Sequence, residues 1–172
     1  MKTVWRGGAQ AAHAALLALV LWLAGCDGDR IRALEEGVST EADVRRAFGE
    51  PERIWPEADG ARTFEYNRQP AGQRNYMITI GPDGRMSALR QVLTPANFAA
   101  IQPGMAADEV RRRLGRPMKD TPFARIGETV WDWRYLEPPN TPMVFSATFG
   151  PDGRVLRTGS TLDPQSEAQR GG

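Results

Sequence analysis

The pentapeptide GPDGR occurs twice in this chain, at residues 81–85 and again at 150–154. Pro-Asp-Gly is turn chemistry, because proline presets φ, aspartate suits the next position and glycine accepts the left-handed conformation that follows. Alternating, β-forming segments flank both copies, so each copy predicts the tip of a β-hairpin. A duplicated hairpin indicates an internal repeat, and a repeat constrains the whole fold.

Further features recur in the same order upstream of each pentapeptide. Segments 37–51 and 104–117 both contain a glycine, a short polar cap, Val-Arg-Arg, an apolar residue and Gly-x-Pro. An alternating segment follows each of them and places two aromatic residues on one strand face. These residues are Phe64 and Tyr66 in the first copy, and Trp131 and Trp133 in the second. The sequence therefore predicts two tandem units.

Each unit is expected to hold two short helices followed by three strands. The predicted helices are 31–36 and 40–48 in the first unit, and 95–101 and 106–114 in the second. Glycine and then proline end the second helix of each unit. The strands should pair antiparallel in sequence order, with the helices on one face. The predicted fold class is α+β: two tandem ααβββ units, each with two short helices packed on a three-stranded antiparallel meander.

The N-terminus has the pattern of a signal peptide. Lys2 and Arg6 precede a mostly apolar stretch of about fifteen residues, which is short for a membrane span. The following Leu-Ala-Gly-Cys, residues 23–26, resembles the lipobox of bacterial lipoproteins. That resemblance implies cleavage before Cys26 and lipidation of Cys26. The chain has one cysteine, and lipidation accounts for a lone thiol in an exported protein.

The expected organisation is a lipoprotein signal peptide over 1–25, the lipidated cysteine and a short tether over 26–30, a first unit over 31–93, a second unit over 94–162, and a disordered tail over 163–172. Four extended residues, Asp27–Arg30, would reach roughly 13 Å, which keeps the first unit close to the membrane. The protein is expected to face the periplasm from the outer membrane. Asp27 leaves the inner membrane open, because aspartate directly after the lipidated cysteine resembles an inner-membrane retention signal.

Composition argues against several classes of function. Loss of the signal removes Lys2 and Arg6 and no acidic residue, so the formal charge falls from +1 to about −1, which does not suggest nucleic-acid binding. The only histidine, His13, leaves with the signal, so most catalytic triads and zinc sites are excluded. Glu65 and Asp132 occupy matching strand positions. Paired carboxylates suit glycosidase chemistry, but acids that alternate with aromatics are more typical of the solvated face of a sheet. We therefore expect no enzyme, cofactor, metal or small-molecule substrate.

The second unit resembles the SmpA/OmlA (BamE-like) family of outer-membrane lipoproteins. The matching stretches are Gly104-Met105, Leu114–Pro117, Asp120 with Pro122-Phe123, and the aromatic strand 131–135. Two features depart from that family, since Thr121 interrupts the Asp-Pro-Phe loop and the unit is duplicated. The duplication gives a looser resemblance to the tandem-repeat β-lactamase inhibitor proteins, which grip an enzyme with a sheet.

The first resemblance implies a non-catalytic binding or scaffold role, with barrel-assembly subunits as protein partners and the membrane bound through the lipid on Cys26. The second leaves open an inhibitor or sensor of a periplasmic enzyme. We expect Phe123 to be the tip of a partner-binding loop over 118–127, joined by Asp120, Pro122 and Trp55. Four arginines are candidates for anionic lipid headgroups, with a solvated helix face as the alternative. They are Arg45, Arg46, Arg111 and Arg112.

Overall fold

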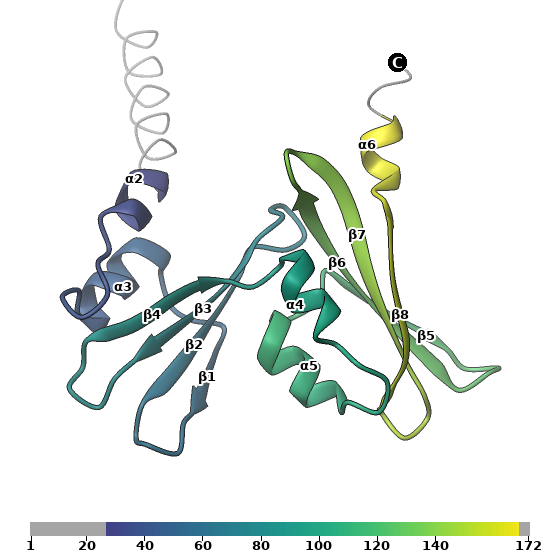
Figure 1. The fold of residues 1–172 in the computed structure, drawn as a ribbon, viewed down its shortest axis with the longest axis horizontal. Coiled ribbons are helices and arrows are strands. Elements are labelled where there is room, and N and C mark those ends of the chain that lie inside the picture. The colour runs from purple at the N-terminus through teal and green to yellow at the C-terminus, as the bar shows by residue number, and fades with distance from the viewer. Residues whose placement is uncertain (1–26, 169–172) are drawn as a thin grey trace, which may run out of the picture.

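A computed structural model describes residues 27–168 as an α+β fold with two four-stranded antiparallel sheets and a few short helices (Figure 1). The first unit comprises α2 (Asp27–Arg32), α3 (Glu41–Phe48), β1 (Arg53–Pro56), β2 (Arg62–Asn67), β3 (Asn75–Ile80) and β4 (Met86–Gln91). The second comprises α4 (Pro95–Ala99), α5 (Ala107–Leu114), β5 (Lys119–Phe123), β6 (Glu128–Glu137), β7 (Thr141–Phe149), β8 (Val155–Leu162) and α6 (Pro164–Ala168). The signal peptide and Cys26 lie outside the described residues.

Each sheet has one strand more than the three predicted. The order is β1-β2-β3-β4 in the first sheet and β5-β6-β7-β8 in the second, so the two units share one topology. The additional strands β1 and β5 pair with the aromatic strands β2 and β6. Both contain a proline, Pro56 or Pro122, which is why the sequence favoured a loop there. At a sheet edge a proline is tolerated, because its missing N–H can face away from the ladder.

The helices α3, α4 and α5 lie within one or two residues of their predicted bounds. Thr40 caps α3, since its hydroxyl accepts the Asp43 N–H at 3.3 Å and the Asp43 carboxylate accepts the Thr40 N–H at 3.0 Å. The prediction of a helix over 31–36 and an extended tether before it was wrong. Helix α2 already begins at Asp27, where acidic residues in a first turn are favoured. A helical segment rises only about 1.5 Å per residue, so Asp27–Arg30 reaches about half as far as predicted.

The prediction of a disordered tail from residue 163 was also wrong for the described part. Asp163 is buried, and its carboxylate binds the Arg134 guanidinium at 2.6 Å and the Gln165 N–H at 3.0 Å. Asp163 thereby caps the start of α6, and Pro164 is its first helical residue. The chain therefore continues as a helix at this point.

The repeated pentapeptide has the same contacts in both units. The carboxylates of Asp83 and Asp152 each accept the N–H of the arginine two residues on, at 3.0 and 3.1 Å. The guanidinium of that arginine donates to the loop that precedes the long helix of the same unit, α3 or α5. Arg85 binds the Val38 carbonyl and Arg154 binds the Gly104 carbonyl, each at 2.8 Å. The hairpin tip therefore fastens the helix entry of its own unit to the sheet.

The end of the long helix is also fastened alike in both units. The Tyr66 hydroxyl donates to the Gly49 carbonyl at 3.1 Å, and the Trp133 indole N–H donates to the Gly115 carbonyl at 3.0 Å. These glycines follow α3 and α5 with φ of 83° and 75°, a left-handed backbone that glycine adopts without strain. Apolar residues between helices and sheet form one core per unit. The first contains Val44, Phe48, Phe64 and Ile78, and the second contains Val110, Leu114, Trp133 and Phe145.

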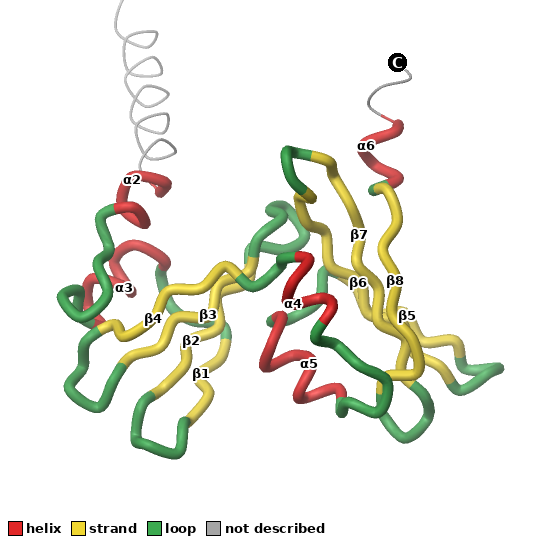
Figure 2. Tube along the Cα trace, in the orientation of Figure 1, coloured by secondary structure: helices red, strands yellow, loops and turns green. Residues whose placement is uncertain are grey.

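Direct contacts join the two units, which lie side by side along the long axis (Figure 2). The Asn75 side-chain amide donates to the carbonyls of Leu114 and Arg116 at 2.9 and 3.1 Å, so a residue of β3 satisfies the end of α5. Gln69 and Arg134 exchange two hydrogen bonds at 2.7 and 3.2 Å. The second unit is therefore docked on the first rather than merely tethered to it.

Candidate functional site

The β5–β6 hairpin carries two exposed, large apolar side chains. Phe123 is the last residue of β5 and is 46% exposed, and Ile126 in the turn is 60% exposed. The Ile126 N–H donates to the Phe123 carbonyl at 3.0 Å, and Gly127 completes the turn with a φ of 67°. Phe123 thus sits on an ordered strand end, whereas the sequence predicted a loop over 118–127. Its ring is about half exposed, so it is accessible to a partner, and its role as a contact residue stays a prediction.

The corresponding hairpin of the first unit shows that the fold itself does not require these apolar residues. There Asp59 precedes the positive-φ glycine, Gly60, where Ile126 precedes Gly127. The Glu57 N–H donates to the Ala61 carbonyl and closes that turn. Glu57 therefore corresponds to Phe123, which closes its own turn by pairing with Glu128. The first unit therefore closes its equivalent hairpin with a turn that is one residue shorter and carries two acids in place of the apolar pair. Ile126 was not among the contacts predicted from the sequence, although it is apolar where the first repeat has Asp59 before the glycine.

Neighbouring contacts hold the hairpin in place. Glu128, directly opposite Phe123, binds the Arg157 guanidinium through two hydrogen bonds of 2.6 and 3.0 Å. The Arg157 contact lowers the pKa of the Glu128 carboxyl, so this pair persists at neutral pH. A Cβ placed on Gly127 would lie 3.6 Å from Pro151, which puts the turn beside the second GPDGR tip. The exposed pair therefore projects from a braced edge.

The other predicted partner contacts are divided between the two units. Asp120 and Pro122 lie exposed on the same strand, β5. Trp55 lies in the other unit and is buried, with its indole N–H donating to Glu65 at 3.1 Å. The proposal of Trp55 as an exposed anchor was wrong, because the docking of the second unit covers it.

All four arginines proposed for lipid headgroups are engaged by carboxylates. Arg45 contacts Glu41 and Glu50, and Arg46 contacts Asp43. Arg111 contacts Glu52 and Glu65, and Arg112 contacts Glu57 at 3.1 Å. Each would have to exchange an existing ion pair for a phosphate, so their arrangement favours a structural role.

The two carboxylates considered for acid–base chemistry serve different purposes. Glu65 has no exposed surface, contrary to the solvated face expected from its alternation with aromatics. Its oxygens accept the Trp55 indole N–H and the Arg116 N–H, and they contact the Arg111 guanidinium at 3.3 Å. Asp132 lies on the second sheet and accepts the Ser146 hydroxyl at 2.6 Å. They do not form a pair across one cleft.

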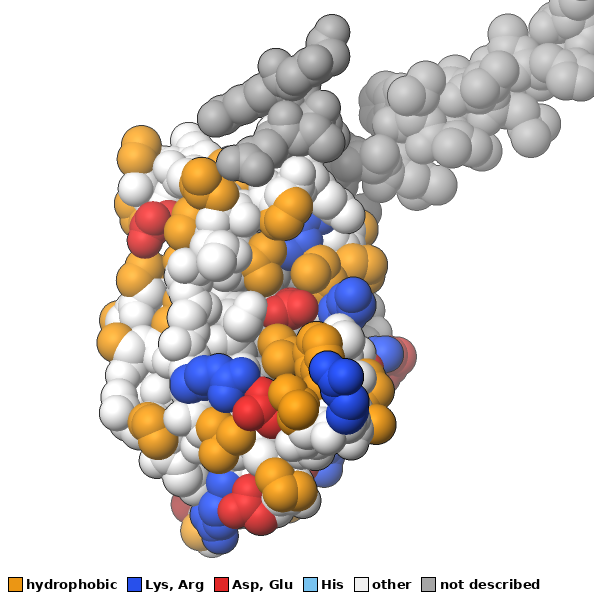
Figure 3. Space-filling model, turned by 90° about the vertical axis from the view of Figure 1, so that its right-hand side faces the viewer, with side chains coloured by type: hydrophobic (Ala, Val, Ile, Leu, Met, Phe, Trp, Pro, Cys, Tyr) orange, Lys and Arg blue, Asp and Glu red, His pale blue; other side chains and the backbone are white. Residues whose placement is uncertain are grey.

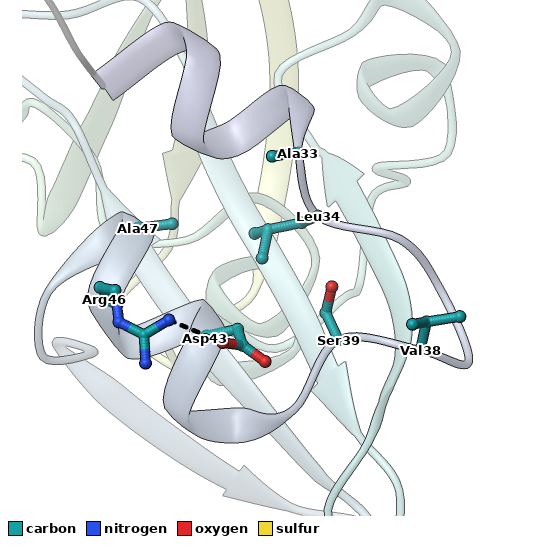
Figure 4. A pocket seen from close by; sticks show the side chains of 7 residues that line it. All are labelled: Ala33, Leu34, Val38, Ser39, Asp43, Arg46 and Ala47. Atoms are coloured by element: carbon teal, nitrogen blue, oxygen red, sulfur yellow. Dashed lines mark hydrogen bonds and ion pairs between the residues drawn. The ribbon is translucent and has the colours of Figure 1, made fainter.

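A hollow of about 390 Å³ lies between α2, α3 and the segment that joins them (Figure 4). Its polar groups already have partners within the protein. The Ser39 hydroxyl accepts the Glu35 N–H at 2.9 Å, and the Asp43 carboxylate bonds with Thr40 and Arg46. This hollow therefore offers little to orient a ligand. It is lined by Ala33, Leu34, Val38, Ser39, Asp43, Arg46 and Ala47.

Among residues 27–168 there is no group of three or more His, Cys, Asp or Glu side chains arranged to hold a metal ion. Within the same residues, none of the helices has the length and apolar character needed to cross a membrane.

No protein-family model matches the chain, and no curated protein matches it either. The resemblance to the SmpA/OmlA family is thus not supported by a family match. Solved structures give weak matches. A DUF4309 family protein of Bacillus subtilis has a TM-score of 0.30 and 20% identity, covering 76% of this chain and 83% of its own.

Two further structures match at similar strength. A Streptococcus mutans protein provisionally assigned as a β-lactamase inhibitor has a TM-score of 0.32 and 8% identity, covering 81% of this chain and 99% of its own. An extracellular protein of Bacillus anthracis that contains an SCP domain has a TM-score of 0.29 and 12% identity, covering 79% of this chain and 48% of its own.

Proposed function

We propose that this chain is a bacterial envelope lipoprotein, anchored through Cys26, with a non-catalytic binding or scaffold role in outer-membrane protein assembly or envelope integrity. The observation that carries the binding role is the exposure of Phe123 and Ile126 on the ordered β5–β6 hairpin. Exposed apolar pairs of this kind lower solubility unless something covers them. The proposed cover is a protein partner facing the periplasm.

The arrangement of the two units supports this proposal. The N-terminal helix α2 lies at one end of the long axis and the β5–β6 hairpin at the other (Figure 1). The direct contacts at Glu65, Asn75 and Gln69 couple the two ends. An anchor at residue 26 would then leave the hairpin free to reach a partner, and the first unit would act as a spacer.

Photo-crosslinking from the hairpin tests the proposal. A photoreactive phenylalanine analogue at Ile126 should crosslink to an envelope protein of the barrel-assembly machinery in living cells. The same analogue at Val38 is the matched control, since Val38 is 55% exposed on a turn of the first unit. Equal crosslinking from both positions, or none from Ile126, would contradict a binding role for this hairpin.

An enzyme inhibitor or sensor is the second candidate. Part of the first sheet's outer face is covered by the second unit, through contacts at Trp55 and Glu65. The equivalent face of the second sheet is the candidate binding surface for this function. That outer face carries Asp132, Arg134 and Ser146 around a hollow of about 400 Å³. Crosslinks from Ile126 to a periplasmic hydrolase, instead of an assembly subunit, would favour this function.

A further inference from the structure

Strand β8 has a free outer edge. It is the last strand of its sheet and pairs only with β7. Its first residue, Val155, is bonded on the outer side, to Gly104 and Met105 at 2.8 and 2.9 Å. From Leu156 to Leu162 no outer partner occurs within the described part of the chain. Seven residues of edge backbone are therefore open to pairing.

The other three sheet edges are protected, as edges of natural sheets usually are. Strand β1 has four residues and ends at Pro56, whose carbonyl already accepts the Arg112 guanidinium at 2.7 Å. In strand β5 the charged residues Lys119 and Asp120 come first, and Pro122 follows just before the hairpin turn, so little of this edge can accept another strand. On β4 the Leu89 N–H donates to the Glu36 carboxylate at 2.8 Å. Strand β8 contains neither proline nor lysine nor an acid.

Strand β4 is the counterpart of β8 in the first unit and has the same bulge near its start. A comparison of the two strands therefore shows which protective features β8 lacks. Leu89 is the fourth residue of β4 and Thr158 the fourth of β8. The Leu89 N–H points outward to Glu36, so the Thr158 N–H points outward as well. Next to these residues stand Arg90 in β4 and Gly159 in β8. Strand β8 thus has glycine where β4 has a charged side chain.

The free stretch is complementary to itself. Its midpoint is Gly159. A two-fold axis at Gly159 would pair Leu156 of each copy with Leu162 of the other copy. Both leucines are exposed, at 45% and 53%. The outward-facing Thr158 would pair with Ser160 of the partner copy. Arg157, the one charged residue in β8, would face Thr161 of the partner copy, so like charges do not meet.

We propose that β8 pairs antiparallel with β8 of a second copy of this chain, across a two-fold axis at Gly159, and joins two four-stranded sheets into one. A second copy matches the edge better than an unrelated peptide, because the loop at Gly104–Met105 and the turn into α6 delimit the same seven residues in both copies. Figure 3 shows the side of the molecule that lies on the right in Figure 1, where uncharged side chains and backbone occupy much of the surface and charged side chains are scattered among them. The two hairpins with Phe123 would then be presented as a pair.

A cysteine at the axis tests this pairing in the full chain. Opposed residues of an antiparallel pair have Cα atoms about 4.5–5.5 Å apart, within the range for a disulfide. Gly159→Cys should therefore form a homodimer under mild oxidation in membranes of expressing cells. Arg90→Cys, at the equivalent position of the protected strand β4, and the wild-type chain with Cys26 should not. A disulfide from Gly159→Cys to a different protein, or no homodimer, would overturn the proposal.

Gly159→Arg supplies the reverse test by giving β8 the residue found in β4. A Cβ on Gly159 meets no atom within 4 Å and its φ is not in the left-handed region, so the monomer should fold normally. Two arginines would face each other across the axis, and like charges at that distance weaken association about tenfold or more. Sedimentation of the purified full chain should show the wild type as a dimer and the variant as a monomer, with unchanged melting. A monomeric wild type would contradict the proposal.

Discussion

The backbone N–H of Arg116 in the second unit donates to the Glu65 carboxylate of the first at 2.8 Å. Glu65 has no exposed surface, so the accepting carboxylate lies in the interior of the junction. Its second oxygen accepts the Trp55 indole N–H. A buried carboxylate is tolerated only when its oxygens are satisfied, and here the second unit supplies part of that satisfaction. The first unit is therefore incomplete without the second.

Glu65→Ala should lower the free energy of unfolding by about 3 kcal/mol, because the change leaves the part-buried Arg116 N–H and the buried Trp55 indole without acceptors. Urea unfolding, followed by tryptophan fluorescence, measures the loss. Asp132→Ala is the matched control at the equivalent strand position, where the carboxylate is half-buried and bonds Ser146. It should lower the unfolding free energy by only about 1 kcal/mol. Equal losses would show that the junction does not depend on Glu65.

Tyr66→Phe should lower the free energy of unfolding by about 1 kcal/mol, through loss of the hydrogen bond to the Gly49 carbonyl. Burial raises the pKa of Tyr66 to about 12, from an ordinary value of 10.0. The folded protein thus holds the phenol proton more tightly than the unfolded chain does. This contribution to stability is complete below about pH 10 and is lost as the pH rises through about 12.

Denaturant unfolding at about pH 9 and about pH 11.5 separates this effect from other alkaline titrations. The difference between wild type and Tyr66→Phe should shrink at the higher pH. A constant difference at both pH values would mean that Tyr66 does not titrate in this window, and that the lost hydrogen bond alone accounts for the variant.

Local signals predicted much of this fold. Thr40 and Gly49 delimit α3 through contacts within the helix itself, and the GPDGR turns bond within five residues. Long-range contacts explain the rest. Trp55 and Glu65 are buried by a helix more than forty residues away in sequence, which alternation along a strand cannot reveal. At the candidate site Phe123 was singled out as a contact residue because it lies in a polar, proline-containing segment, but the sequence did not decide whether its ring is exposed.

Arg154→Ala should lower the free energy of unfolding by about 1 kcal/mol, because its guanidinium holds the Gly104 carbonyl at the entry to α5. Arg85→Ala should cost a similar amount, since Arg85 makes the equivalent bond to Val38. The two arginines belong to separate hairpins with separate partners, so the double variant should show the sum of both losses. Thermal unfolding of all three variants checks this, and a strongly non-additive result would contradict independent roles.

Cys26→Ser should abolish labelling with a radioactive fatty acid and leave unprocessed precursor, as the lipobox predicts. Density-gradient fractionation of the wild type should place the protein in the outer membrane. Asp27→Ser is the companion variant, because aspartate after the lipidated cysteine resembles an inner-membrane signal. Relocation of Asp27→Ser from the inner to the outer membrane would correct the proposed location without affecting the anchor. Normal processing of Cys26→Ser would contradict lipidation.

Phe123→Ala should leave the melting temperature within a degree or two, because the ring is about half exposed and belongs to neither core cluster. Ile126→Asp should be equally harmless, since Ile126 is 60% exposed and Asp59 likewise precedes the positive-φ glycine of the first unit's turn. Phe123→Glu is avoided, because Glu128 lies directly opposite and like charges there destabilise the strand pair. The double variant should lose chemical crosslinking to the partner by about tenfold, as expected for removal of apolar anchors. A chemical crosslinker replaces the photoreactive residue here, because Ile126 itself is changed. If Phe123 were part of the core, its loss would cost about 3–5 kcal/mol, so a fall of many degrees in melting temperature with undiminished crosslinking would rule out the contact role.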